Sequence, residues 1–505
     1  MLRLLSLLFS ALCATGLVAQ QDLEARLDAV KEFARYFRKA KEEALQVEAV
    51  MTLKGNECVP AANQLLKLLK HKRAAVRDTA LKVLSTYREQ ETFQELIDEL
   101  PKEKDKKKVA AWVMVLGRSK IAAAVAAIED VAGREKAGST IRYESIRALI
   151  AIGKPGQTGL FGKCVTDKEA VVRAAACDAI GELKVRGLAG PLITRLADEQ
   201  WQVQSAAIGA VASLRPQEAV QPLIDLMRQS GRLRTECAEA LFRITSMDFG
   251  VDPDRWQAQW QTLMSIEGWR IPTDAELAQK LANRKKYDAF YGKKDEMSSF
   301  AGIPTTSTNV LFVIDVSGSM DNLVVEVDKF RDYKDRKRFT IVQTELLNTI
   351  ETLGRDTNFN IVAFATDLKP WKSRLVPGNV VNRDSAKNFV RKLRPIGGTE
   401  AQELARSGLG GAANLGAGKT NTYKALLYGF GVDPAKPVKG PLTGFDKKAL
   451  KRPLDTMYFL SDGRPSVGKL IDTNEILAAV NKYNGQYRTV IHTIAIGSFQ
   501  KEFLK

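Results

Sequence analysis

The chain has 505 residues, which is too long for one ordinary hydrophobic core, so we expect two or more domains. Its composition, 45% hydrophobic and 27% charged, is that of a globular protein and excludes a wholly disordered or membrane-embedded chain. The net charge of +17 favours anionic partners, such as nucleic acid, acidic glycans, anionic membranes or acidic proteins, without choosing among them.

Residues 1–19 have the pattern of a secretory signal peptide. A positive start at Arg3 is followed by an interrupted apolar run, and small Ala19 precedes a polar stretch. The alternatives are a lipid-attached Cys13, disfavoured because Leu12 is not small, and a buried N-terminal helix. No later run reaches the ~20 apolar residues that a membrane helix needs. We therefore expect an exported protein (periplasmic, at the cell surface or secreted) with no transmembrane segment and no nucleic-acid partner.

Cysteine usage after the predicted signal peptide favours thiols over disulfides. The number is even, and an exported protein meets an oxidising compartment, but no two cysteines form a C-x-x-C pair. We expect buried free thiols in helices, with disulfides as the alternative. The cysteines are Cys58, Cys164, Cys177 and Cys237.

Residues 20–250 contain an internal repeat with a period near 31. Each copy begins with an apolar residue and carries further apolar residues seven, eight and eleven positions later. This spacing places the four side chains on one stripe of a helix. The copies begin at Val76, Ile141, Val172, Val203 and Leu233, with a weaker copy through Val115 and Leu116.

A second amphipathic stretch follows the first in several copies, for example at 190–197 and 220–227, with a turn such as Arg215-Pro216 between the two. Two short helices per repeat are typical of an α-solenoid, and the repeats resemble HEAT-like repeats over roughly residues 40–250. An irregular helical domain is the alternative, because the copy near Lys108 is poor. In either case the segment provides a scaffold or a binding surface.

Residues 251–304 are expected to cap the array and to lead into a second domain. Asp252-Pro253 indicates a break, and the charged, aromatic stretch 283–294 indicates a linker. The expected cap contains Trp256, Trp260 and Trp269.

The second domain, residues 305–505, begins with a buried strand that ends in oxygen-bearing side chains. The apolar run 310–314 predicts a buried parallel strand, and Asp315, Ser317 and Ser319 follow it. Side chains at the C-terminal end of a central strand in an α/β sheet project into the crevice where ligands bind. One carboxylate and two hydroxyls are hard ligands suited to Mg²⁺, Mn²⁺ or Ca²⁺.

Further strands and helices alternate along this domain, as a doubly wound, mainly parallel sheet requires. Continuous apolar runs predict the strands, and amphipathic stretches predict the helices. The predicted strands are 360–364, 457–461 and 490–496, and the predicted helices are 341–353, 385–393 and 476–483.

The oxygen-bearing residues resemble the metal-ion-dependent adhesion site of von Willebrand factor type A domains. The D-x-S-x-S string at 315–319, a threonine loop around Thr420 that opens a helix, and Asp462 after a later strand occur in the order of that family. The resemblance spans about residues 305–500. It implies a Rossmann-like domain of this family behind HEAT-like repeats, in an exported protein of bacterial type.

The resemblance also implies a role for each site residue. Ser317, Ser319 and Thr420 would be direct hydroxyl ligands, and Asp315 and Asp462 would bind the cation directly or through water. An Asp or Glu of a partner would fill one open position of the octahedron. The implied function is divalent-cation-dependent adhesion to an acidic protein or surface ligand.

Two features depart from the family pattern. The stretch 395–400 also resembles the threonine loop, so Thr399 is a rival ligand to Thr420. The family closes with a helix that begins here within 499–504, so we expect a domain shortened at its last helix.

We interpret the chain as a binding protein and not as an enzyme. The stretch 413–420 also fits a relaxed phosphate-loop pattern. Such a loop must follow a buried strand, but here a polar, glycine-rich stretch precedes it, so a nucleotide hydrolase is a remote alternative. The two histidines, His71 and His492, assemble no triad and no two-His zinc site. A metal-independent binder of an anionic glycan or surface polymer, using the basic run 329–337, is the main alternative.

Overall fold

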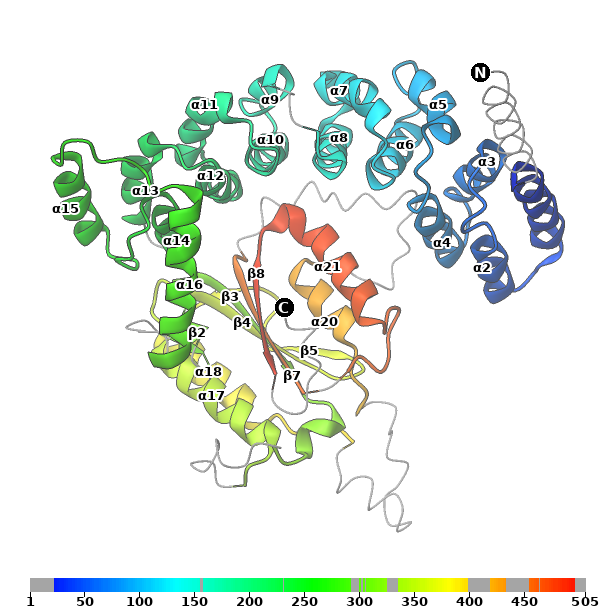
Figure 1. The fold of residues 1–505 in the computed structure, drawn as a ribbon. Coiled ribbons are helices and arrows are strands. Elements are labelled where there is room, and N and C mark those ends of the chain that lie inside the picture. The colour runs from blue at the N-terminus through cyan, green and yellow to red at the C-terminus, as the bar shows by residue number, and fades with distance from the viewer. Residues whose placement is uncertain are drawn as a thin grey trace, which may run out of the picture. The chain divides into compact units, whose positions relative to one another are not determined.

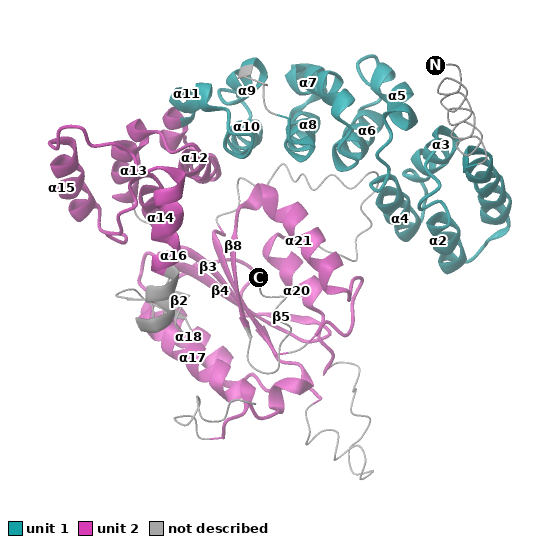
Figure 2. Ribbon diagram, viewed as in Figure 1, with its two compact units in different colours: residues 1–192, 438–443 teal, residues 193–437, 444–505 magenta. Residues whose placement is uncertain are grey.

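The computed structural model of the chain forms two compact units, residues 1–192 with 438–443 and residues 193–437 with 444–505 (Figure 2). The predicted signal peptide and the predicted last helix lie outside the residues that the structure describes. The described residues are 22–154, 158–229, 231–291, 299–300, 303–304, 306–324, 335–397, 418–432, 454–462 and 464–495.

The first unit consists of short helices joined by turns (Figure 1). Neighbouring helices pack in pairs, such as α3 with α4 and α7 with α8. Several helices also contact the helix two places along the chain, as α6 contacts α8 and α8 contacts α10. The helices are residues 22–39, α2 (Glu43–Met51), α3 (Val59–Leu68), α4 (Ala74–Leu84), α5 (Gln90–Glu99), α6 (Lys106–Arg118), α7 (Val125–Gly133), α8 (Ser139–Ile152), α9 (Thr158–Cys164), α10 (Ala170–Glu182) and α11 (Ala189–Thr194).

The second unit begins with further helices of the same kind. They are α12 (Trp201–Leu214), α13 (Val220–Met227), α14 (Leu233–Thr245), α15 (Pro253–Met264) and α16 (Asp274–Tyr291). Asp252 caps α15 by accepting hydrogen bonds from the backbone N–H groups of Asp254 and Arg255. Residues 283–291, predicted as linker, are the last turns of α16, because this stretch contains no glycine or proline and is rich in helix-forming residues.

The predicted apolar stripes form the core of the helical array. Val76, Val172 and Val203, which begin three of the predicted copies, are fully buried, and so are Ile180 and Val211 eight positions along two of the copies. Burial of one stripe per helix is what stacking of amphipathic repeats produces. The prediction of repeated helices is therefore confirmed.

A left-handed residue follows the first helix of successive repeats and recurs with the period of the array. Lys184 after α10, Arg215 after α12 and Ser246 after α14 all have φ near +60°, and Gly153 ends α8 in the same conformation. These four positions are separated by 31 residues each time. A left-handed residue reverses the chain after a helix, so it sets the turn into the second helix of each repeat.

A six-stranded mixed sheet follows the helices in the second unit, with its strands in the order β5-β4-β3-β7-β8 and with β6 also paired to β4. The pairs β3–β4, β3–β7 and β7–β8 are parallel, whereas β5 and β6 run antiparallel to β4. The strands are β3 (Asn309–Asp315), β4 (Asn358–Phe364), β5 (Leu368–Pro370), β6 (Val376–Pro377), β7 (Thr456–Ser461) and β8 (Val490–Ala495), and β1 (Ser299–Phe300) pairs with β2 (Ile303–Pro304) in a separate ribbon.

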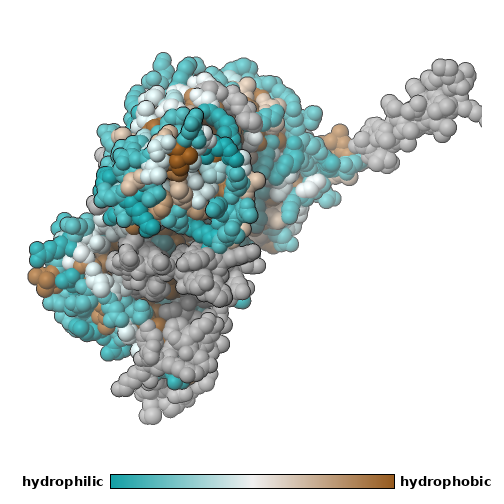
Figure 3. All heavy atoms as spheres, turned by 60° about the vertical axis from the view of Figure 1, so that its left-hand side comes forward, coloured by the Kyte–Doolittle hydropathy of each residue, from teal (hydrophilic) through white to brown (hydrophobic). Residues whose placement is uncertain are grey.

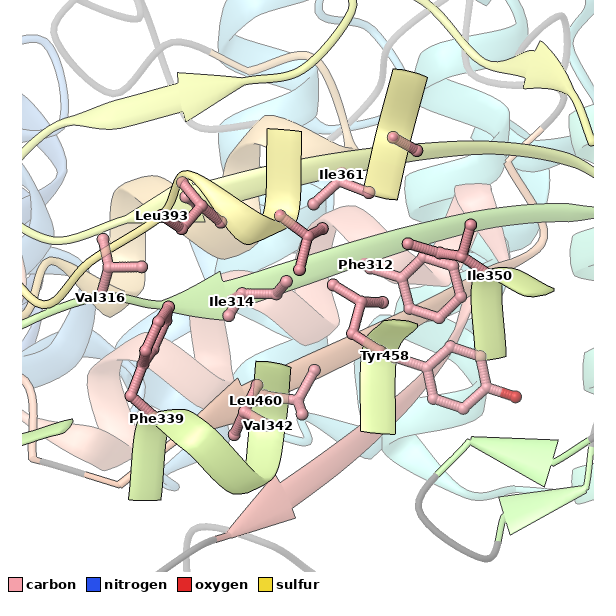
Figure 4. Packing of buried hydrophobic residues seen from close by; sticks show 14 of the residues in the cluster. Phe312, Ile314, Val316, Phe339, Val342, Ile350, Ile361, Leu393, Tyr458 and Leu460 are labelled. Carbon is pink, nitrogen blue, oxygen red and sulfur yellow. The ribbon is translucent and has the colours of Figure 1, made fainter. Parts of the chain in front are cut away.

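Helices cover both faces of this sheet (Figure 1). Alternate residues of β3 point to opposite faces, so Phe312 and Ile314 pack with α17 (Arg338–Thr352) and α18 (Val380–Arg391), whereas Leu311 and Val313 pack with α20 (Thr422–Gly429) and α21 (Thr473–Tyr487). Figure 4 shows the first of these two cores, in which the ring of Phe312 stacks on that of Tyr458 with centroids 5.5 Å apart. The sheet thus has four parallel strands, β4, β3, β7 and β8, and the inner three, β4, β3 and β7, are enclosed between two helical layers.

The four cysteines after the predicted signal peptide are buried free thiols, as expected. None of the described helices combines the length and the apolar character that crossing a bilayer requires. The face drawn in Figure 3 is mostly hydrophilic, with hydrophobic side chains in small separate spots.

Candidate metal centre

The carboxyl ends of β3, β4 and β7 meet at one edge of the sheet, because these strands are parallel. Asp315 is the last residue of β3, and its carboxylate accepts a hydrogen bond from the backbone N–H of Ser317 at 2.8 Å. This contact turns the chain sharply into a short 3₁₀ turn at 318–321, which carries Ser319. The D-x-S-x-S segment is therefore folded back on its own strand end.

Hydrogen bonds join four of the five predicted site residues. The hydroxyl oxygens of Ser317 and Ser319 lie 3.2 Å apart, and the Ser319 hydroxyl donates to Asp462 Oδ1 at 2.8 Å. Ser461, the last residue of β7, donates its hydroxyl to Asp315 Oδ2 at 2.5 Å. The two carboxylates and two predicted hydroxyls thus come from neighbouring strand ends and face one another.

The fifth predicted residue, Thr420, is held at the same edge by its backbone. Its N–H donates to Ser466 Oγ at 2.9 Å, and its carbonyl oxygen accepts from the N–H of Ser466 at 2.9 Å. The next residue, Asn421, donates its N–H to the carbonyl oxygen of Ala365 just beyond β4 at 3.0 Å. Thr420 is therefore fixed between the end of β4 and the segment after β7, and its side chain is buried.

The loop after α18 completes this edge. The N–H of Ile396 donates to the carbonyl oxygen of Val316 at 2.8 Å. A Cβ on Gly418 would lie 2.2 Å from the carbonyl oxygen of Ile396, so this close approach of two loops requires glycine. The rival ligand Thr399 lies outside the described residues, a few positions beyond this contact.

Burial makes the charged form of Asp315 unfavourable. The side chain is fully buried, and this desolvation raises its pKa to about 6, although hydrogen bonds from Ser317 and Ser461 act in the opposite direction. The nearby negative charge of Asp462 raises the pKa further. A bound cation would reverse this balance, because a positive charge at the carboxylate favours ionisation.

Sequence reasoning missed two residues of this site, Ser461 and Arg338. Ser461 was detectable as a small polar residue at the end of an apolar strand, directly before Asp462. Arg338 Nη1 donates to Asp462 Oδ2 at 2.5 Å from the first turn of α17. Arg338 and Asp462 are 124 positions apart in the sequence, and a basic residue at the start of an amphipathic helix gives no signal of such a contact.

The residues present fit a hard divalent cation. Carboxylate and hydroxyl oxygens are the ligands that Mg²⁺, Mn²⁺ and Ca²⁺ prefer. Asp315 is fully buried, and its oxygens accept hydrogen bonds from the neutral Ser317 and Ser461, so its negative charge lacks a direct counter-ion among these contacts. Within the described part of the chain, no three His, Cys, Asp or Glu side chains lie together as a metal cluster, so the hydroxyls are essential to this set.

Comparison with known proteins supports the helical repeats. The family of HEAT repeats matches residues 158–241, which run from the start of α9 into α14. This segment therefore contains HEAT repeats.

The chain is also weakly similar to inter-alpha-trypsin inhibitor heavy chains. It is 28% identical to heavy chain H1 of Mesocricetus auratus over 36% of this chain and 15% of that protein. The corresponding values are 28%, 20% and 10% for heavy chain H4 of Homo sapiens, and 31%, 21% and 10% for heavy chain H3 of Bos taurus. The matches thus span 15% or less of the length of these three relatives.

A solved structure of an engineered protein is similar over 52% of this chain and 80% of that chain. The sequence identity is 18% and the TM-score is 0.29, so this likeness carries no argument about fold or function.

Proposed function

We propose that this chain is an exported binding protein that recognises an acidic group on a protein or surface ligand through a divalent cation. The observation that supports this proposal most directly is the cluster of Asp315, Ser317, Ser319 and Asp462, which hydrogen bonds draw together at the carboxyl edge of the sheet. Two ionised carboxylates balance the charge of a divalent cation, and the hydroxyls add no charge. One position of the octahedron would stay open, so the cation would retain affinity for one more oxygen ligand from outside.

The fold supports assignment of residues 305–505 to the von Willebrand factor type A type. A parallel core of β4, β3 and β7 with helices on both faces is the architecture that a doubly wound domain requires. The weak similarity to inter-alpha-trypsin inhibitor heavy chains, which contain such domains, points in the same direction and favours protein binding. We therefore propose a domain of this type behind HEAT repeats.

Each site residue has a proposed task. Ser317, Ser319 and Thr420 would hold the cation by their hydroxyl oxygens, and Asp315 and Asp462 would balance its charge directly or through water. The cation, most suitably Mg²⁺ or Mn²⁺, would supply a Lewis-acidic position for a partner's carboxylate. The HEAT repeats would serve as a scaffold or as a second binding surface, since stacked helices present an extended face.

The contacts of the threonine loop argue against the nucleotide-hydrolase alternative. A phosphate loop presents free backbone N–H groups to the phosphates. Here the N–H groups of Lys419, Thr420 and Asn421 donate to Thr366 Oγ1, Ser466 Oγ and the carbonyl oxygen of Ala365. In the described part of the loop, these three N–H groups are therefore not available to a phosphate.

Asp315→Asn is the variant that tests the proposal. Asparagine keeps a side-chain oxygen for the N–H of Ser317 and removes the charge, so the fold should survive while Mg²⁺ and Mn²⁺ binding, measured by isothermal titration calorimetry, weakens at least about a hundredfold. Asp367→Asn is the matched control, because this exposed acid follows the neighbouring strand β4 and pairs with Lys424. Equal binding by Asp315→Asn and the wild type would contradict the proposal.

The same titration decides between the two threonines. Thr420→Ala should lose the affinity for the cation, and Thr399→Ala should keep it; the reverse result would move the ligand to Thr399.

Binding of acidic partner proteins should require Mg²⁺ and vanish in EDTA. Binding that resists EDTA and falls with salt would instead favour the anionic-glycan alternative.

A further inference from the structure

Arg338 places a positive charge inside the candidate metal centre. Its guanidinium Nη1 donates to Asp462 Oδ2 at 2.5 Å, and the two side chains are 11% and 0% exposed. The other carboxylate oxygen, Oδ1, accepts the hydroxyl proton of Ser319 at 2.8 Å. Both oxygens of Asp462 are therefore engaged by groups of the protein itself.

The start of α17 does not favour a basic residue on its own account. The N-terminal end of a helix carries a partial positive charge, which repels Lys and Arg. Arg338 is nevertheless the first residue of α17, and Lys337 precedes it. Each has an acidic partner near the site: Arg338 pairs with Asp462, and Lys337 Nζ lies 2.8 Å from Asp321 Oδ1. Contacts with the site thus offset an unfavourable position.

The backbone fixes where the guanidinium lies. The N–H of Arg338 donates to the carbonyl oxygen of Asn322 at 3.0 Å, and the N–H of Val324 donates to that of Arg336 at 3.0 Å. The neighbouring Phe339 is buried in the same core cluster as Ile314 and Val316 (Figure 4). The first turn of α17 is therefore anchored next to the D-x-S-x-S segment.

The guanidinium is only partly satisfied in this place. Its Nε is buried and has no hydrogen-bond acceptor among the described residues. A buried donor without a partner costs free energy, so this contact is weaker than a fully paired buried ion pair. An ion pair of this kind can be replaced by a ligand that satisfies Asp462 better.

We propose that Arg338 is a built-in counter-ion of the metal centre: it neutralises Asp462 when no divalent cation is bound, and the cation binds by releasing this pair. The inference rests on the proposed function. A guanidinium and a divalent cation compete for the same carboxylate, because two positive charges within a few ångströms repel each other in a buried site. Arg338 therefore lowers the affinity for the cation and stabilises the cation-free protein.

The test compares the full-length wild type with Arg338→Gln and Lys337→Gln by calorimetric titration with Mg²⁺ and with Mn²⁺. Arg338→Gln should bind both ions roughly ten- to a hundredfold more tightly, which corresponds to the loss of one competing charge-assisted hydrogen bond. Lys337→Gln removes the same charge one residue away without touching Asp462, and its affinity should change by less than about threefold. Equal gains by both variants, or unchanged or weaker binding by Arg338→Gln, would overturn the inference.

The pattern of failure separates the two proposals. If the wild type and Arg338→Gln bind with the same dissociation constant, the metal site stands and the counter-ion role falls. If neither protein binds either ion, the metal site itself falls and the counter-ion role with it.

A measurement on the wild type covers the case in which Arg338→Gln does not fold. Labelling by phenylglyoxal, quantified by peptide mass spectrometry, should increase severalfold at Arg338 when Mg²⁺ replaces EDTA, because the released guanidinium becomes accessible. Arg215 is the matched control, since its side chain is 10% exposed and it pairs with Asp274 away from the site, so its labelling should stay constant. Unchanged labelling of Arg338 in a protein that binds Mg²⁺ would overturn the inference.

Discussion

Just before β7, Asp455 holds a carboxyl group that burial makes costly to ionise. Its side chain is 6% exposed, and desolvation raises its pKa to about 6. The charge of Arg232 and hydrogen bonds from Thr456, Thr308 and Ser307 act in the opposite direction without restoring the ordinary value. The folded protein therefore keeps a proton on Asp455 at a pH where the unfolded chain has released it.

Asp455→Asn should flatten the pH dependence of stability. Because the pKa of Asp455 is about 6 in the folded protein and ordinarily 3.8, its stabilising contribution is present below about pH 4 and is lost as the pH rises through about 6. Over this window the free energy of unfolding of the wild type should fall by about 2–3 kcal/mol more than that of the variant. Urea unfolding in EDTA at several pH values measures the difference, and parallel profiles would refute it. The pKa of Asp315 is raised in both proteins, so its contribution to the pH dependence cancels in the comparison.

The site residues differ in how far the sequence around them predicts their place in the site. Asp315, Ser317 and Ser319 follow an apolar run within five positions, so strand prediction and spacing placed them at one strand end, whereas Asp462 was assigned to the same site by the resemblance to the von Willebrand factor type A pattern. Arg338 could not be found in this way, because its contact depends on how the first turn of α17 docks against the site. Whether these residues bind a cation stays a prediction.

Among the elements, the strands were predicted more closely than the helix ends. The apolar runs 310–314, 360–364 and 457–461 correspond to β3, β4 and β7, since a strand enclosed between two helical layers must be apolar throughout. By contrast, α18 begins at Val380, five residues before the predicted start, because Asn379 caps it. Val380 and Val381 are exposed and break the amphipathic pattern. Of the left-handed residues after the repeat helices, Arg215 lies in a turn that the sequence predicts, whereas Lys184 and Ser246 gave no signal, because lysine and serine are not typical of that conformation.

Close contact between α6 and α8 makes Gly117 sensitive to a methyl group. A Cβ at this position would lie 2.6 Å from Ala148 Cβ and 2.7 Å from Ala148 Cα, so the backbones would have to move apart. Gly117→Ala should lower the free energy of unfolding by about 1–3 kcal/mol. Gly209→Ala, inside α12 with nothing within 4 Å of its Cβ, should instead raise it by up to about 1 kcal/mol through helix propensity. Chemical denaturation measures both, and equal effects would show that α6 and α8 pack less closely than described.

At the scale of the molecule, Arg232 connects the last repeats of the second unit to the sheet. From the N-cap position of α14, its Nη1 donates to the carbonyl oxygens of Asp455 (3.1 Å) and Arg488, which lie just before β7 and β8. Its Nη2 donates to Ser205 Oγ at 3.2 Å and pairs with Glu236, and the guanidinium lies over the ring of Trp201. One buried side chain thus joins α12, α14 and the amino ends of two strands.

Arg232→Gln should weaken the coupling between these helices and the sheet. The carbonyl oxygens of Asp455 and Arg488 and the carboxylate of Glu236 would lose a buried donor, so the free energy of unfolding should fall by about 3 kcal/mol. Differential scanning calorimetry should also show a broader or divided transition. Arg228→Gln removes a half-exposed arginine whose partner Asp254 is in solvent, and it should change stability by about 0.5 kcal/mol or less. An effect of Arg232→Gln as small as that of the control would refute the coupling.

The four buried thiols are built-in probes of local opening of the helices around them. Cys58, Cys164 and Cys177 lie in the first unit and Cys237 in the second, and burial raises the pKa of Cys164 and Cys237, so these thiols are slow nucleophiles while the helices around them stay closed. Each becomes reactive only when its surroundings open. The rate at which an alkylating reagent reaches each position therefore reports how often that part of the array comes apart, without any foreign label.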